Sequence, residues 1–87
     1  MSIGVSHNLD TGKVVLLDQA ARKIYDFEPV RARALASDLR AAAFAGGAVL
    51  IVATADDGQQ VRIGGEADRA RAMADDLDRN ADLGRGV

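Results

Sequence analysis

The chain has 87 residues, 48% of them hydrophobic and 28% charged, with a formal net charge of −2. This length accommodates one domain at most, and the composition excludes a disordered chain. The charge provides no overall attraction to phosphate backbones or anionic lipids, and the absence of cysteine excludes disulfides and thiolate chemistry.

The sequence shows no targeting or membrane-spanning pattern. A signal peptide would place a basic segment before an apolar run, and the chain does not begin in this way. Its longest apolar stretch, residues 48–53, is far shorter than the ~20 residues needed to cross a bilayer. We therefore expect a cytoplasmic protein that makes no contact with a membrane.

Three strands are predicted in the first part of the chain. Residues 3–9 alternate between apolar and small polar side chains, which favours a half-exposed strand. A glycine-containing turn at residues 10–12 returns the chain into a strand over residues 13–18, which is apolar on both faces and is therefore expected to be central. A third strand is predicted over residues 23–27.

A helix is predicted next, over residues 28–43. Pro29 suits the first helical position, where its missing N–H leaves no hydrogen bond unmade, and Gly46 suits a helix stop. One face of this helix carries the apolar residues expected to pack on a sheet. They are Ala32, Leu35, Ala36, Leu39 and Ala43.

The second part of the chain predicts two strands and a second helix. Residues 48–55 are apolar on both faces, and a glycine turn at residues 56–58 leads into a strand over residues 60–63. A helix over residues 66–81 follows, again with one apolar face. That face consists of Ala70, Met73, Ala74, Leu77 and Ala81.

The two halves resemble each other. Residues 28–39 align without gaps on residues 66–77, with most positions identical, and a glycine turn and a strand precede each helix. The first copy holds an additional strand-length segment around residues 18–27. The alternative is that helices rich in Ala and Arg resemble each other by composition alone.

The predicted fold is a single α+β domain, residues 1–87, that contains an internally duplicated β-β-(β)-α unit. The first repeat, residues 1–46, carries the extra strand, and the second repeat covers residues 47–87. We expect a five-stranded, mainly antiparallel sheet with both helices on one face.

The helix that begins with Glu28 and Pro29 contains the pattern Ala-Arg-x-Leu-Ala-x-x-Leu over residues 32–39. Together with the preceding glycine turn and strand, it resembles short uncharacterised proteins of actinobacteria and their phages, over roughly residues 8–44. The resemblance implies a cytoplasmic accessory protein of the host cell or phage that binds and modulates another protein. It implies no catalytic residues.

If both helices cover one face of the sheet, apolar side chains must remain on the other face. These would be Val14, Leu16, Leu50 and Val52, or else their neighbours Val15, Leu17, Val49 and Ile51. An apolar face of this kind is typical of a protein contact, and the simplest cover is a second copy in a homodimer. The candidate interface residues are Val14, Leu16, Tyr25, Phe27, Leu50 and Val52. The alternative is that twisted strands and the loop at residues 19–23 cover this face internally.

His7 is the only histidine, and as a general base it would need a carboxylate such as Asp10 or Asp57 within hydrogen-bonding reach. We interpret His7 as a partly buried structural residue near a strand end. The acidic clusters at residues 56–57 and 75–78 lack the spacing of a calcium loop and fit a turn and a solvated helix face. We expect no catalytic residues, no metal site and no cofactor.

Four arginines stand at equivalent places near the two helix starts: Arg31, Arg33, Arg69 and Arg71. Such arginines could hold phosphates, so nucleic-acid binding is the alternative function. Acidic neighbours, the lack of a helix-turn-helix pattern and the scarcity of stacking aromatics argue against it. The sequence therefore favours a non-enzymatic protein-interaction module, and a small enzyme around His7 is the third hypothesis.

Overall fold

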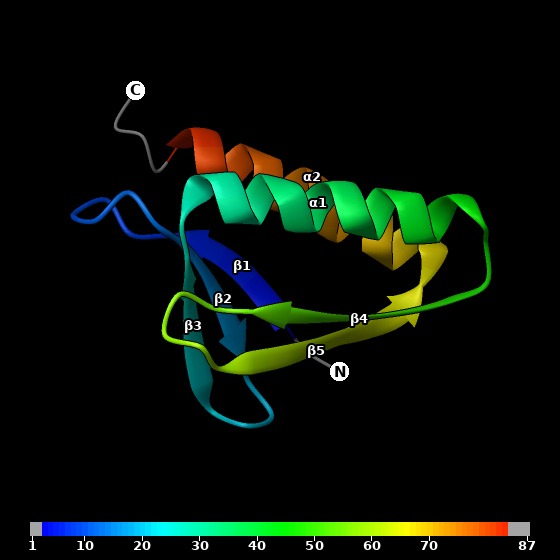
Figure 1. The fold of residues 1–87 in the computed structure, drawn as a ribbon, viewed down its shortest axis with the longest axis horizontal. Coiled ribbons are helices and arrows are strands. Elements are labelled where there is room, and N and C mark those ends of the chain that lie inside the picture. The colour runs from blue at the N-terminus through cyan, green and yellow to red at the C-terminus, as the bar shows by residue number, and fades with distance from the viewer. Residues whose placement is uncertain (1–2, 84–87) are drawn as a thin grey trace.

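The computed structural model describes residues 3–83, which form five strands and two helices (Figure 1). Each element corresponds to one predicted from the hydrophobic pattern, so the α+β class is confirmed. In chain order the elements are β1 (Ile3–His7), β2 (Val14–Asp18), β3 (Lys23–Phe27), α1 (Pro29–Phe44), β4 (Ala48–Thr54), β5 (Gln60–Glu66) and α2 (Ala67–Leu83).

The strands form two antiparallel sheets, one with the order β1-β2-β3 and the other with β4 and β5. The expectation of a single five-stranded sheet was therefore wrong. The β4–β5 hairpin runs across the three-stranded sheet (Figure 1), so β3 and β4 do not lie alongside each other. The hairpin turn reaches β3, where the N–H of Asp56 donates to the carbonyl oxygen of Asp26 at 2.9 Å.

The two helices lie side by side above the strands and run in opposite directions (Figure 1). Arg33, near the start of α1, forms an ion pair with Asp82, near the end of α2. At the other end, Nη2 of Arg71 in α2 donates to the carbonyl oxygen of Ala43 at 3.1 Å. Gly46, with a φ of 78°, turns the chain out of α1 and donates its N–H to the same oxygen at 3.0 Å.

Corresponding positions of the two helices face the core. Helix α1 begins at Pro29 and α2 begins at Ala67, which are the residues aligned in the repeat. Four aligned pairs are buried in both helices, and in the fifth pair Leu35 is buried whereas Met73 is half-buried. The four buried pairs are Ala32 and Ala70, Ala36 and Ala74, Leu39 and Leu77, and Ala43 and Ala81. Because most of these side chains are small, the helices approach each other closely.

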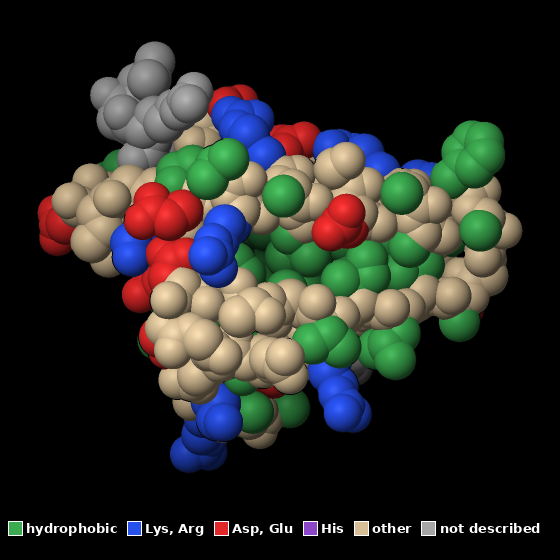
Figure 2. Space-filling model, viewed as in Figure 1, with side chains coloured by type: hydrophobic (Ala, Val, Ile, Leu, Met, Phe, Trp, Pro, Cys, Tyr) green, Lys and Arg blue, Asp and Glu red, His purple; other side chains and the backbone are tan. Residues whose placement is uncertain are grey.

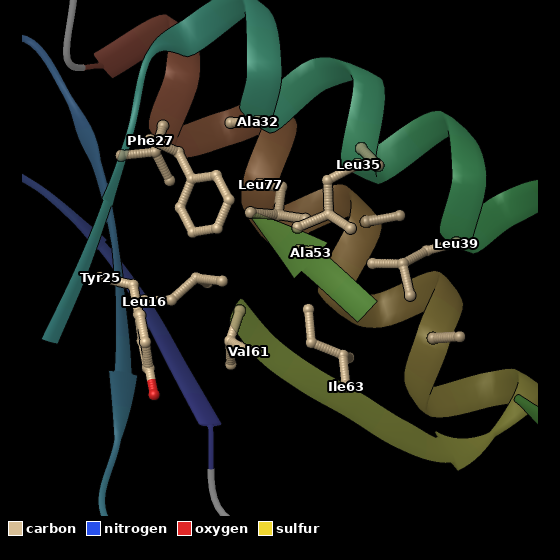
Figure 3. Close-up of a cluster of buried hydrophobic side chains, with 14 of the residues drawn as sticks. Leu16, Tyr25, Phe27, Ala32, Leu35, Leu39, Ala53, Val61, Ile63 and Leu77 are labelled. Atoms are coloured by element: carbon tan, nitrogen blue, oxygen red, sulfur yellow. The ribbon is translucent and has the colours of Figure 1, made fainter. Parts of the chain in front are cut away.

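The hydrophobic core lies between the helices and the two sheets, where aromatic and aliphatic side chains from both halves converge (Figure 3). Phe27, Leu16, Leu39, Leu77 and Val14 are its largest fully buried side chains. Burying one such side chain contributes roughly 1.5–3 kcal/mol. No buried polar or charged residue is found among the described residues.

Each helix packs against a strand from the other half of the chain. Helix α2 packs against β1, and α1 packs against β4. The contact between β1 and α2 includes a hydrogen bond of 2.7 Å between Nδ1 of His7 and Oδ1 of Asn80. The two halves therefore share one core.

Candidate interaction surfaces

The structure divides the six candidate interface residues into two groups. Four of them, Val14, Leu16, Tyr25 and Phe27, are at most 5% exposed and belong to the core. The other two lie on the surface, since Leu50 is 70% exposed and Val52 is 50% exposed. In the described chain, only Leu50 and Val52 of this set are available for a protein contact.

The residues that face the core are even-numbered in β2 and odd-numbered in β4. In β2 the inward residues are Val14 and Leu16, and the neighbouring Val15 and Leu17 lie on the outer face, half-buried. In β4 the inward residues are the odd-numbered ones, such as Val49, whereas Leu50 and Val52 point outward. The outer faces of the two sheets therefore carry separate apolar patches.

The outer face of β4 is the more exposed patch. Leu50 is paired with Gly64 and Val52 with Arg62 across the hairpin. Because glycine has no side chain, the residue directly opposite Leu50 on β5 does not shield it. On the outer face of the three-stranded sheet, Leu17 is half-buried between Gly4 and the 65% exposed Ile24.

Two grooves lie beside the helices, and both have apolar floors. The first, which we call the α1 groove, lies between α1 and β4, has a volume of about 300 Å³, and is visible as a hollow in Figure 2. The second, the α2 groove, lies between α2, β5 and β1 and has a volume of about 290 Å³. The α2 groove is walled by Ile3 and Val5 of β1.

The helix sides of the two grooves are equivalent in the repeat. Arg31, Ala34, Leu35 and Asp38 line the α1 groove, and the residues aligned with them line the α2 groove. The aligned residues are Arg69, Ala72, Met73 and Asp76. The strand before the helix differs, because Phe27 of β3 lines the first groove where Gly65 of β5 lines the second. Sequence reasoning found the repeated arginines but not the grooves, which are formed by residues distant in the chain.

An ion pair closes the junction between the two sheets. Nζ of Lys13 lies 3.0 Å from Oδ2 of Asp56, and the N–H of Glu28 donates to Oδ1 of Asp56 at 3.2 Å. Burial raises the pKa of the Asp56 carboxyl, but the hydrogen bonds from Lys13 and Glu28 outweigh it, so the pKa lies below its ordinary value. The hydrogen bond to Asp56 raises the pKa of Lys13. These residues hold the hairpin turn against β3 and are structural.

His7 joins β1 to α2. The Asn80 amide donates from Nδ2 to the carbonyl oxygen of Asp76 at 2.8 Å, which leaves Oδ1 to accept from Nδ1 of His7. The hydrogen bond thus goes to Asn80 and not to Asp10 or Asp57, the partners considered for a general base. Among residues 3–83, no three His, Asp or Glu side chains are grouped to hold a metal ion.

The four arginines proposed for nucleic acid lie apart. Because the helices are antiparallel, the starts of α1 and α2 are at opposite ends of the helical layer. Arg33 pairs with Asp82 and Arg71 with Asp68, while Arg31 and Arg69 line different grooves. No single surface of the described chain gathers all four.

Ion pairs form both within α2 and between the two helices. The pair of Asp68 and Arg71 is present, with 3.0 Å between the charged atoms. Asp75 accepts from Arg40 of the other helix at 2.8 Å, and Arg40 also donates to Asp78 at 2.7 Å. The hydrogen bonds to Asp75 and Asp78 raise the pKa of Arg40.

Within the described part of the chain, neither helix has the length and apolar character that a membrane span requires. A comparison with protein-family models, with curated proteins and with solved structures gave no match for this chain.

Proposed function

We propose that this protein is a non-enzymatic protein-interaction module that forms a homodimer through the outer face of β4. The observation that carries the proposal is the exposure of Leu50 and Val52 as neighbours on one face of the hairpin. Large aliphatic side chains gain roughly 1.5–3 kcal/mol each when fully buried. A second copy of the same face would bury both.

The charges around this face suit a symmetric contact. The outward residues of β4 are uncharged, whereas β5 presents Arg62 and Glu66 on either side of Gly64. A two-fold axis that passes close to Gly64 would place Arg62 of each copy beside Glu66 of the other. Such an isologous contact uses one patch on both subunits and brings opposite charges together.

The homodimer would serve a role as a cytoplasmic accessory protein that binds and modulates a protein partner. The resemblance of roughly residues 8–44 to short actinobacterial and phage proteins supports this role. Nucleic-acid binding gains no support, because the repeated arginines lie at opposite ends of the helical layer.

Sedimentation equilibrium tests the dimer. The wild-type chain should self-associate, and the double variant Leu50→Ser with Val52→Thr should be a monomer that remains folded. Ile24→Thr, which removes an exposed aliphatic side chain from the other sheet, is the matched control and should leave the dimer intact. A wild-type chain that stays monomeric at its highest soluble concentration would contradict the proposal.

Charge reversal tests the orientation. Arg62→Glu alone and Glu66→Arg alone should each weaken the dimer, because each sets like charges against each other across the interface. The double variant restores opposite charges and should recover the dimer. If the double variant is weaker than either single variant, the two-fold arrangement is wrong.

A further inference from the structure

We propose that the α1 groove binds an extended peptide segment of a partner protein, which adds as a strand to the free edge of β4. The proposal takes from the proposed function only that the chain binds proteins. It concerns a surface that overlaps the proposed dimer face only at Val52, which borders the groove, whereas Leu50 lies outside it.

The alternation of hydrogen bonds between β4 and β5 shows which backbone groups of β4 are left at its free edge. At one end, the N–H of Ala55 donates to the carbonyl oxygen of Gln59 at 2.8 Å. In an antiparallel ladder, alternate residues bond to the partner strand. Val49, Ile51 and Ala53 therefore pair with β5, and the backbone groups of the even-numbered residues between them point away from it. Within residues 3–83, no strand pairs with that side of β4.

This edge carries none of the usual protection against strand addition. Natural edge strands avoid it with charged side chains, proline or bulges. β4 has seven residues, none charged, and pairs with β5 in unbroken register. By contrast, β3 carries Lys23 and Asp26, and β5 carries Arg62 and Glu66. The remaining edge strand, β1, also lacks Asp, Glu, Lys and Arg but has only five residues, so β4 offers the longest uncharged edge in the described chain.

The groove beside this edge offers a place for apolar side chains. Phe27, Leu35 and Ile51 line it, and the space-filling view shows hydrophobic side chains at the bottom of the hollow between α1 and β4 (Figure 2). On the helix side stands Ala34, whose short side chain leaves room above Leu35. A strand bound to β4 would point alternate side chains into this space.

Charged side chains on α1 indicate which residues of the bound peptide would flank its central apolar residue. Arg31 and Asp38 line the groove about two helical turns apart, roughly 10 Å. Residues two positions before and after a central strand residue share its face and are roughly 13 Å apart, a difference that the long Arg31 side chain can span. Arg31 lies at the Thr54 end of β4, because the following turn is bonded to Glu28. A segment antiparallel to β4 would therefore carry an acidic residue first, then an apolar one, then a basic one, at alternate positions.

A peptide fits this groove better than a second copy of the chain. The edge supplies backbone donors and acceptors at strand spacing, which an extended polypeptide satisfies. Pairing of β4 with β4 of a second copy would bring the two α1 helices together above the same seam. A single extended segment avoids this crowding.

The test uses the heptapeptide Thr-Asp-Thr-Ile-Thr-Lys-Thr in an NMR titration of the isotope-labelled protein. Amide signals of Leu50, Val52 and Thr54 should shift, with slowed hydrogen exchange. Paired residues of an antiparallel ladder point their side chains to the same face, so the peptide threonines should bond to β4. N-methylation of the threonine amides should abolish binding, whereas N-methylation at Asp, Ile and Lys should preserve it. Absence of shifts at millimolar peptide, or equal binding of both methylated forms, would overturn the proposal.

Variants of α1 complete the experiment. Ala34→Leu should fill the groove and weaken binding at least tenfold, whereas Ser37→Leu, which adds the same side chain outside the groove, should not. The pair Arg31→Glu and Asp38→Lys should weaken binding of this peptide and favour one with Asp and Lys exchanged. If Ala34→Leu leaves binding unchanged, the groove is not the site.

The two proposals fail separately. If Leu50→Ser with Val52→Thr abolishes the dimer but the peptide causes no shifts, only the groove proposal is wrong. If the peptide binds a chain that is always monomeric, only the homodimer is wrong. If Ala34→Leu abolishes self-association, the edge of β4 pairs with a second copy and the peptide assignment is overturned.

Discussion

Lys13 lies with its Nζ 3.0 Å from Oδ2 of Asp56, and this ion pair connects the start of β2 to the β4–β5 turn. The side chain of Asp56 is 17% exposed and that of Lys13 is 31% exposed, so solvent screens the pair only in part. Asp56 also accepts from the backbone of Glu28. The junction between the two sheets thus depends on the ionised forms of Lys13 and Asp56.

We predict that this junction makes stability depend on pH at both extremes. The folded pKa of Asp56 is below its unfolded value of 3.8, so its contribution is present above that pH and is lost as the pH falls through the folded pKa. The folded pKa of Lys13 is above 10.5, so its contribution is present below that pH and is lost as the pH rises through the folded pKa. Urea unfolding of wild type, Asp56→Asn and Lys13→Met across pH measures both effects.

In a plot of the free energy of unfolding against pH, Asp56→Asn should reduce the loss of stability at low pH (the acid limb). Lys13→Met should reduce the loss at high pH (the alkaline limb), each relative to wild type. The control is Asp38→Asn, on the exposed surface of α1, which should leave the acid limb unchanged. An acid limb as steep in Asp56→Asn as in wild type would show that other carboxylates cause it.

Removal of the Arg71 side chain should destabilise the end of α1. Its Nη2 satisfies the carbonyl oxygen of Ala43 in the last turn, and a hydrogen bond from a charged group is worth about 1.5–3 kcal/mol before solvent exposure reduces it. We expect Arg71→Ala to lower the free energy of unfolding by about 1 kcal/mol, a shift of about 4–8 °C in Tm. Arg79→Ala, which breaks only an ion pair within α2, should shift Tm by less.

Leucines on β2 and β4 should differ sharply in their contribution to stability. Leu16 is fully buried, so Leu16→Ala should cost about 2–5 kcal/mol of unfolding free energy. Leu50 is 70% exposed, so Leu50→Ala should change it by less than about 0.5 kcal/mol at a dilution where the chain is monomeric. Equal losses, measured by urea unfolding, would mean that Leu50 is buried in the isolated chain.

The interhelical arginine Arg40 should contribute stability that depends on salt. It bridges Asp75 and Asp78 across the helix pair, and all three side chains are partly exposed. Arg40→Gln should destabilise the chain at low ionic strength, and about 1 M salt should remove most of the difference, because screening weakens exposed ion pairs. Ser37→Gln, on the outer surface of α1, controls for the change of side chain. A difference that persists in high salt would indicate packing of the Arg40 stem instead.

Local patterns in the sequence predicted the elements well, because helix faces and turns depend on neighbouring residues. The spacing of Ala32, Leu35 and Leu39 correctly predicted the buried face of α1. Strand phase was not predictable in the same way. Residues 14 and 15 are both valines within an apolar run, so the local sequence does not distinguish them. Only the packing of the whole sheet decides that Val14 points inward.

Long-range relationships were beyond the sequence pattern. Whether β3 and β4 join into one sheet depends on how the hairpin crosses the three-stranded sheet, and apolar runs of similar length allow either result. The α1 groove was missed for the same reason, since Phe27, Leu35 and Ile51 come from three different elements. Its only trace in the sequence is the repeated spacing of an arginine and an aspartate on each helix.

The packing of β1 against α2 has a consequence for how the chain is made. His7 and Asn80 lie 73 positions apart, so β1 leaves the ribosome well before the helix that covers it and can pack against α2 only after α2 has been made. Neither half retains a complete core when severed at Gly46 and Gly47. Two fragments expressed separately should therefore be unstructured alone and should fold on mixing, as the two parts of a split reporter do.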